Sequence, residues 1–296
     1  MQNDMDYVGF APVERFENAP EEHRPWDLLP GAKTVVSMSI KMFKGAQVAM
    51  IRGFNHPELR HVMFSYRWFA YGLSNLLFMD RAALLVVRLL EEEGHVAMPI
   101  AASGVGYSKN NLQNFSNRHA GVAAGLAEFG WNGLALTPEN GPRQRFVSVL
   151  TTAKLDADPM YEGPKLCDLK KCMELGAGVP LCVKSCPMQA FLSQGKKEVV
   201  IGGKRMEYAK LNFKACNKIH DKVSDTETPD YSKIDSSGQE GVLVQNLQLE
   251  PRFELERMVF RRGHGCGFCL FSCPVGAPKE IKDIMDPEIK ARLSWT

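Results

Sequence analysis

Cysteine is the residue type whose spacing first suggests chemistry in this sequence. Three thiols, those of Cys266, Cys269 and Cys273, lie within eight positions, and Pro274 follows at once. An earlier cysteine-rich segment also ends in a Cys-Pro pair. In a reducing compartment, cysteines at such spacing are metal ligands or redox groups more often than structural disulfides.

All eight cysteines fall in the last 130 residues. Their arrangement resembles that of two-cluster ferredoxins, in which the cysteine before proline ligates the other of two clusters. Two [4Fe-4S] clusters are therefore predicted, with the first thiol group comprising Cys167, Cys172, Cys182 and Cys273 and the second comprising Cys186, Cys216, Cys266 and Cys269. Structural zinc and unligated redox thiols are the alternatives, but zinc sites do not need a proline after the last thiol.

The first thiol group departs from ferredoxin spacing. Four residues separate Cys167 from Cys172, and nine separate Cys172 from Cys182, where two and two are usual. An inserted segment, ELGAGVP, can loop out between the second and third cysteines. The ligand set of the first cluster is thus less firmly predicted than that of the second.

Composition indicates a folded protein without an obvious affinity for nucleic acid or membranes. The chain has 296 residues, of which 45% are hydrophobic, and a formal net charge of +2. It contains no apolar run of about 18 residues, which a membrane-spanning helix would need. The first residues lack the layout of a secretory signal and a twin arginine. We therefore expect a cytoplasmic protein.

The first half alternates strand-like and helix-like segments. Apolar and β-branched runs predict strands over 33–43, 95–102 and 145–153, and helical periodicity predicts helices over 56–94 and 116–130. Such alternation is typical of an α/β domain with a central sheet, which we assign to residues 1–160.

The second half, residues 161–296, has short elements. A hairpin is predicted over 198–208, turning at Gly202 and Gly203, and a polar surface loop over 221–242. Such a domain has little core of its own, and bound metal can supply the stability that packing does not.

Several longer stretches carry a family resemblance. They are YVGFAPV (7–13), LLPGAKTVVSMSI (28–40), AGLAEFGWNGLALTPENGPRQRFVSVLTTAKLDADPMYEG (124–163) and GGKRMEYAKLNFKAC (202–216). Together with the cysteine segments, they resemble the epoxyqueuosine reductases and the corrinoid-dependent reductive dehalogenases. The segment 124–163 is closer to the dehalogenase-like branch.

This resemblance implies a fold, cofactors and partners. It implies a nitroreductase-like corrinoid-binding core followed by a ferredoxin-like domain, with base-off cobalamin between them, reduced to Co(I) through the two clusters. The residues implied to contact the corrinoid are Asn111, Gly125, Gly130, Trp131, Asn132 and Gly141. The implied partners are a small-molecule substrate, or a modified nucleoside that can be carried on tRNA, and an electron donor of the ferredoxin or flavodoxin type. The oligomeric state is left open.

The resemblance also suggests catalytic residues. Epoxyqueuosine reductases carry an aspartate as proton donor where this chain has Asn111, and an amide cannot act as a general acid. The dehalogenases instead pair a tyrosine with a basic residue. The matching candidates here are Tyr107, Arg143 and Arg145.

Two other classes of function remain open from the sequence. The chain could be a ferredoxin-type electron-transfer protein, with a flavin or a partner bound to its first half. It could also be a reductive activator of another corrinoid protein, without turnover of a small molecule. A bound corrinoid would exclude the electron-transfer hypothesis and leave the reductase and the activator hypotheses.

Overall fold

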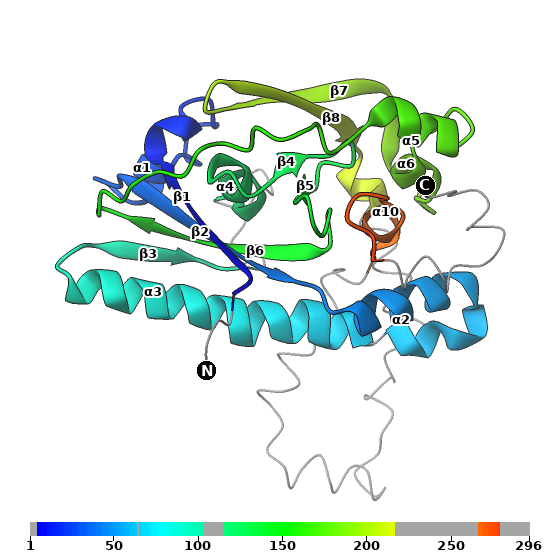
Figure 1. Ribbon diagram of the computed structural model, residues 1–296, viewed down its shortest axis with the longest axis horizontal. Coiled ribbons are helices and arrows are strands. Elements are labelled where there is room, and N and C mark those ends of the chain that lie inside the picture. Colours follow the sequence, from blue (N-terminus) through cyan, green and yellow to red (C-terminus); the bar gives the residue numbers. More distant parts are fainter. Residues whose placement is uncertain (1–4, 64, 103–114, 217–265, 279–296) are drawn as a thin grey trace, which may run out of the picture.

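A computed structural model describes residues 5–63, 65–102, 115–216 and 266–278 (Figure 1). Its central sheet has four strands in the order β1 (Tyr7–Pro12), β2 (Thr34–Lys41), β6 (Gln144–Thr151) and β3 (Ala97–Ile100). Every neighbouring pair in this sheet is antiparallel. The predicted central sheet with helices between its strands is confirmed, and the structure adds that its strands are antiparallel.

Helices cover both faces of the sheet because strand residues alternate between the faces. Val35 and Leu150 pack with α4 (Asn117–Ala123) in one hydrophobic core. Val36 and Val149 belong to a second core beneath α3 (Asp80–Glu92) on the opposite face. Figure 1 shows α4 on one side of the sheet and the long α3 helix on the other.

Most predicted elements of the first half are present with shifted ends. The helix predicted over 56–94 is divided into η2 (Pro57–Met63), a π-helical segment η3 (Tyr66–Met79) and α3. The helix predicted over 116–130 ends early, at Ala123, because Gly125 adopts a positive φ of 76°. The sequence analysis missed α2 (Lys44–Asn55). The remaining short elements are η1 (Val13–Phe16), α1 (Pro25–Leu28), β4 (Glu128–Phe129) and β5 (Ala135–Leu136).

The second half contributes short helices and one long hairpin. The helices are α5 (Leu169–Leu175), α6 (Leu181–Lys184) and α10 (Phe268–Phe271). The hairpin joins β7 (Phe191–Ile201) to β8 (Lys204–Leu211), and its turn falls at Gly202 and Gly203 as predicted, both with positive φ. The loop predicted over 221–242 lies outside the described residues.

The two halves share hydrophobic cores. Ile201 and Met206 of the hairpin pack into the core around α4. A third core joins Met50 of α2 and Tyr66 of η3 to Phe271 of α10. Residues on the two sides of the predicted boundary at 160 therefore pack against one another. None of the helices in the described part of the chain has the length and apolar character needed to cross a membrane.

Candidate functional site

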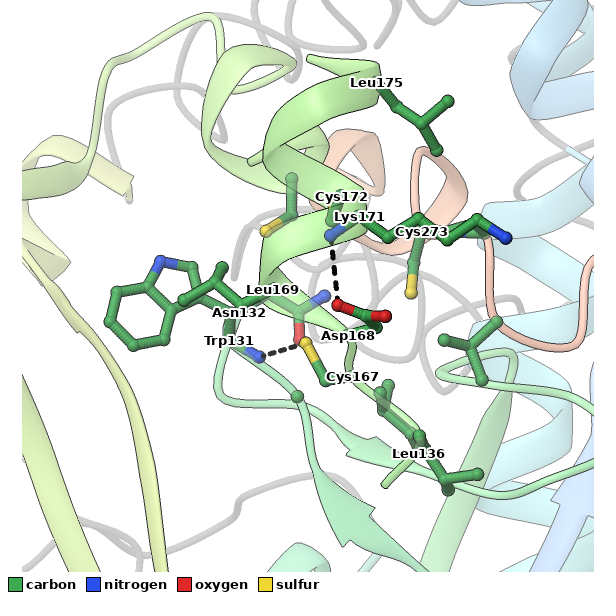
Figure 2. Close-up of a pocket in the computed structure, with 15 residues that line it drawn as sticks. Trp131, Asn132, Leu136, Cys167, Asp168, Leu169, Lys171, Cys172, Leu175 and Cys273 are labelled. Carbon is green, nitrogen blue, oxygen red and sulfur yellow. Dashed lines mark hydrogen bonds between the residues drawn. The ribbon is translucent and has the colours of Figure 1, made fainter. Parts of the chain in front are cut away.

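One cavity of about 260 Å³ gathers the four thiols of the first group. Cys167 precedes α5, Cys172 lies within α5, Cys182 lies within α6, and Cys273 follows α10. Figure 2 shows Cys167, Cys172 and Cys273 approaching one space from different elements. The structure therefore brings together cysteines separated by about a hundred residues of sequence, as the ferredoxin pattern predicts.

Local hydrogen bonds orient the thiols of the first group. The backbone N–H of Trp131 donates to Sγ of Cys167, and that of Leu181 donates to Sγ of Cys172, both at 3.3 Å. Such bonds favour the thiolate, whereas burial disfavours it and raises the pKa of both cysteines. A metal must therefore displace the thiol protons when it binds.

The second thiol group is defined by mutual electrostatic contacts. The pKa of Cys266 is raised to about 11, mainly by burial and further by Cys216 and Cys186. Cys269 is affected by the same partners and by Cys266, after burial, and its pKa is also raised. Ala190 donates its backbone N–H to Sγ of Cys186 at 3.3 Å. These four cysteines are the predicted second group.

Arg143 clamps the segment that carries the last cysteine. Its guanidinium donates to the carbonyl of Val275 at 2.8 Å, to that of Phe271 at 3.3 Å and to that of Cys273. Its side chain is buried, and burial lowers its pKa to about 10, so it remains charged at neutral pH. This environment gives Arg143 a role in positioning Cys273 and differs from the catalytic role predicted for it.

Arg145 lies in a different environment, beside the second thiol group. Its Nη2 donates to the hydroxyl of Tyr66 at 2.8 Å, and its guanidinium lies 3.9 Å from the ring centroid of Tyr71. Tyr66 is buried, and desolvation raises its pKa despite the nearby Arg145, so it stays a phenol. Cys266 and Cys269 are among the charged neighbours of Tyr66. Two aromatic side chains thus fix one cation near the second thiol group.

Arg118 of α4 adds a second cation to this region. Its Nη1 donates to the carbonyl of Gly133 at 2.9 Å. Solvent reaches its side chain, yet surrounding protein desolvates the guanidinium and lowers its pKa. Tyr208, Cys269 and Arg145 are its strongest charged neighbours. No carboxylate in the described part of the chain forms an ion pair with either arginine.

The predicted corrinoid contacts are distributed over three environments. Gly130, Trp131 and Asn132 line the cavity of the first thiol group, and Nδ2 of Asn132 donates to the carbonyl of Cys269 at 3.0 Å. Gly125 and Gly141 lie against the protein's own backbone: a Cβ would collide with the carbonyl of Pro159 at the first and of Val275 at the second. These two glycines permit close chain packing. Asn111 and the candidate Tyr107 lie outside the described residues.

Two residues of this region were missed by sequence reasoning. Tyr66 lies within the helix predicted over 56–94 and is buried. Its hydrogen bond to Arg145 depends on tertiary contact between η3 and β6. Arg118 had no distinguishing sequence signal, because its setting arises only where α4, β8 and the second thiol group meet.

The geometry also bears on zinc as an alternative. A single zinc ion holds four thiolates at about 2.3 Å, so their sulfurs must be close to one another. Among the residues that the structure describes, no group of three or more histidine, cysteine or acidic side chains is arranged to hold one metal ion. Four thiols spread around a cavity suit a larger, polynuclear cluster.

The fold of this chain is similar to that of two kinds of reductase among solved structures. The catabolic reductive dehalogenase NpRdhA has a TM-score of 0.50 and 16% identity, and the match covers 98% of this chain and 34% of that one. An epoxyqueuosine reductase gives a TM-score of 0.45 with 17% identity over 98% of this chain and 67% of that one. The enzyme from Bacillus subtilis gives 0.44 and 17% over 97% and 66%.

These likenesses show a shared fold at low sequence identity. The chain spans about two thirds of the length of the epoxyqueuosine reductases and about one third of the dehalogenase. No protein-family model and no curated protein sequence matches it.

Proposed function

We propose that this chain is an iron-sulfur oxidoreductase that holds two [4Fe-4S] clusters and a corrinoid and reduces a small molecule. The observations that support it most directly are the cavity lined by Cys167, Cys172, Cys182 and Cys273 and the electrostatic contacts of Cys266 and Cys269 with Cys186 and Cys216. In the proposed arrangement, each group of four is completed by a Cys-Pro cysteine from the other cysteine-rich segment. Two adjacent clusters form an electron relay, and a relay implies an acceptor nearby.

The residues present fit iron-sulfur clusters. Each group supplies four thiols, which is the ligand number that a [4Fe-4S] cluster requires. The cavity of the first group is lined by apolar side chains such as Leu136, Leu169 and Leu175. Backbone N–H groups donate to sulfur in both groups. Ligand identity, exclusion of solvent and hydrogen bonds to sulfur are the features by which proteins tune the reduction potentials of such clusters.

The electron path is proposed to run from the first group to the second. The second group has two arginines and a buried tyrosine around it, whereas the first is enclosed by chain segments and clamped from behind by Arg143. Cations that have no carboxylate partner suit a place where negative charge develops during a reaction. An external donor of the ferredoxin or flavodoxin type would then deliver electrons at the first group.

In this proposal, the described residues contribute one side of a corrinoid and substrate site. Arg118 is exposed and bonded to the carbonyl of Gly133, and Arg145 is held by Tyr66 and Tyr71. When bound, the corrinoid would supply low-potential reducing chemistry at cobalt that no side chain can perform. Arg145 would stabilise an anionic leaving group or oxygen, and the hydrogen bond to Tyr66 would orient its guanidinium toward that group.

The experiment is a metal analysis of protein purified without oxygen from cells supplied with cobalamin. We expect about eight irons, about eight sulfides and one cobalt per chain, with an absorbance spectrum that dithionite changes. Eight irons without cobalt, even after reconstitution, would support a ferredoxin-type electron carrier or a flavin protein instead. Protein that carries cobalt but turns over no small molecule would support an activator of another corrinoid protein. Absence of iron would overturn the proposal as a whole.

A further inference from the structure

The outward face of α3 carries a stripe of large apolar side chains. Leu84, Leu85 and Leu89 are 53%, 47% and 59% exposed, and Leu77 and Phe78 in the preceding turn are 54% and 45% exposed. The inward face of the same helix is packed beneath the sheet. An apolar surface of this extent, contributed by α3 and the end of η3, marks a place where another molecule docks.

Charged residues are ordered along the same stripe. Residues three, four and seven positions apart share one side of a helix, so Arg81, Arg88 and Glu92 lie among the exposed leucines. Arg81 lies in the first turn, Arg88 in the third, and Glu91, Glu92 and Glu93 end the helix. Asp80, also in the first turn, is partly buried and accepts a hydrogen bond from the backbone N–H of Ala102. The outermost charges of the stripe are therefore Arg81 at one end and Glu92 at the other.

We propose that this stripe, Leu77 to Glu92, binds the same stripe of a second copy in an antiparallel pair. A twofold axis beside Val87 places Leu85 opposite Leu89 of the partner subunit. It also places Arg81 opposite Glu92 of the partner subunit. In a symmetric dimer each contact occurs twice, so one complementary pair of side chains stabilises the interface at two places.

The charge order favours a second copy over other occupants. An antiparallel pair brings each positive end against a negative end, whereas a parallel pair would bring Arg81 against itself. An anionic membrane would repel the glutamates that end the helix. Arg81 also makes a contact within its own chain, and the five N–H donors of a guanidinium allow it a second partner.

This inference does not depend on the proposed function. The stripe lies on the face of the sheet opposite α4, and it contains none of the cysteines (Figure 1). A dimer joined there leaves both thiol groups on their own protomers. The metal analysis can therefore contradict the proposed function while sedimentation confirms the dimer, and the opposite pair of results is equally possible.

The test is sedimentation equilibrium of the full chain, purified without oxygen, over a micromolar concentration range. We expect a reversible dimer. Leu85→Glu, at an exposed position where folding is unaffected, should raise the dissociation constant about 100-fold. Arg81→Glu and Glu92→Arg should each raise it about 10-fold, and the double variant should return to within about threefold of the unmodified chain. Arg52→Glu, on the exposed side of α2, is the matched control and should change nothing.

Several results would overturn the inference. One is a chain that stays monomeric over the whole concentration range, which would mean that another segment or protein covers the stripe. Another is a dimer that Leu85→Glu leaves intact, which would place the interface elsewhere. A double charge swap that fails to restore association would refute the antiparallel arrangement. Circular dichroism of each variant verifies that loss of dimer is not loss of fold.

Discussion

The two thiol groups have the same number of ligands and different surroundings. The first lies in a cavity lined largely by apolar side chains and backbone, with the guanidinium of Arg143 bound to carbonyls behind Cys273. The second has ionisable neighbours: Tyr66 near Cys266 and Cys269, and Arg118 near Cys269. Under the proposed function, the first group would hold a cluster that relays electrons, and the second would lie where the reaction is assisted.

The comparison depends on which four cysteines bind the same cluster. Double substitutions test this grouping most directly. Cys273→Ser should lose about four of eight irons. Adding Cys167→Ser should lose no more, because both residues belong to the first group. Adding Cys216→Ser instead should remove nearly all iron. The measurement is iron and sulfide content after anaerobic reconstitution.

An uncrossed arrangement predicts the opposite for the same variants. If each cysteine-rich segment bound its own cluster, Cys273 and Cys216 would share one, and that double variant would keep about four irons. Ser185→Ala is a suitable control, since this hydroxyl hydrogen-bonds to Ser272 at 2.9 Å between the two Cys-Pro segments without offering a thiol.

The second environment is proposed to assist the reaction, and Arg145 tests this. Arg145→Met should lower turnover about 100-fold while leaving the iron content unchanged, because a cation that stabilises developing negative charge is lost. Tyr66→Phe should lower it about 10-fold, since the ring remains and only the hydrogen bond disappears. The assay is substrate-dependent oxidation of reduced viologen.

Arg205 of the hairpin provides the control for Arg145. It is an exposed arginine paired with Glu198 at 2.7 Å, so Arg205→Met should leave turnover unchanged. If the Arg145→Met variant and the unmodified chain have equal turnover, the proposal that the surroundings of the second thiol group assist the reaction is contradicted.

The first environment is proposed to be held by Arg143. Arg143→Met should lower the free energy of unfolding by about 3 kcal/mol, because buried carbonyls of the Cys273 segment lose their donors. Arg145→Met, half-buried and bonded to one hydroxyl, should lower it by about 1 kcal/mol. Urea denaturation under anaerobic conditions gives both values. Similar losses of stability for the two variants would contradict the proposal that Arg143 stabilises the Cys273 segment whereas Arg145 assists the reaction.

A further expected effect is a pH dependence that arises at His119, beside Arg118. Burial, with smaller contributions from Arg118 and Lys197, lowers the pKa of His119 to about 3. Its ring accepts or donates a bond of 2.7 Å at Ser116 Oγ and packs edge-on against Phe129. The unfolded chain, with an ordinary histidine pKa of about 6.5, binds more protons below that pH. Folding stability should therefore fall as the pH drops through the window from about 6.5 to 3.

His119→Gln, which cannot titrate, isolates this contribution. The unmodified chain should lose about 2 kcal/mol more than the variant between pH 7 and pH 5, measured by urea denaturation. The thiols of the first group have raised pKa values and do not titrate in that range. Parallel pH profiles for the two proteins would show that His119 is not held neutral by its surroundings.

The sequence predicted elements best where periodicity and turn chemistry agree. The hairpin turn at Gly202 and Gly203 was predicted because paired glycines adopt positive φ readily, and strands β2, β3 and β6 because apolar runs suit buried strands. The end of α4 was misplaced because alanines at 123 and 124 continue the helical pattern. Only the backbone at Gly125 ends it.

The types and spacing of the cysteines predicted two four-thiol groups, since a [4Fe-4S] cluster needs four sulfurs and, in two-cluster ferredoxins, a Cys-Pro cysteine ligates the neighbouring cluster. The tertiary structure decided the roles of the arginines. Arg143 and Arg145 are two residues apart, yet one binds the carbonyls of a cysteine segment and the other binds Tyr66. A guanidinium takes its function from the acceptors around it, and those acceptors come from segments that only folding brings together.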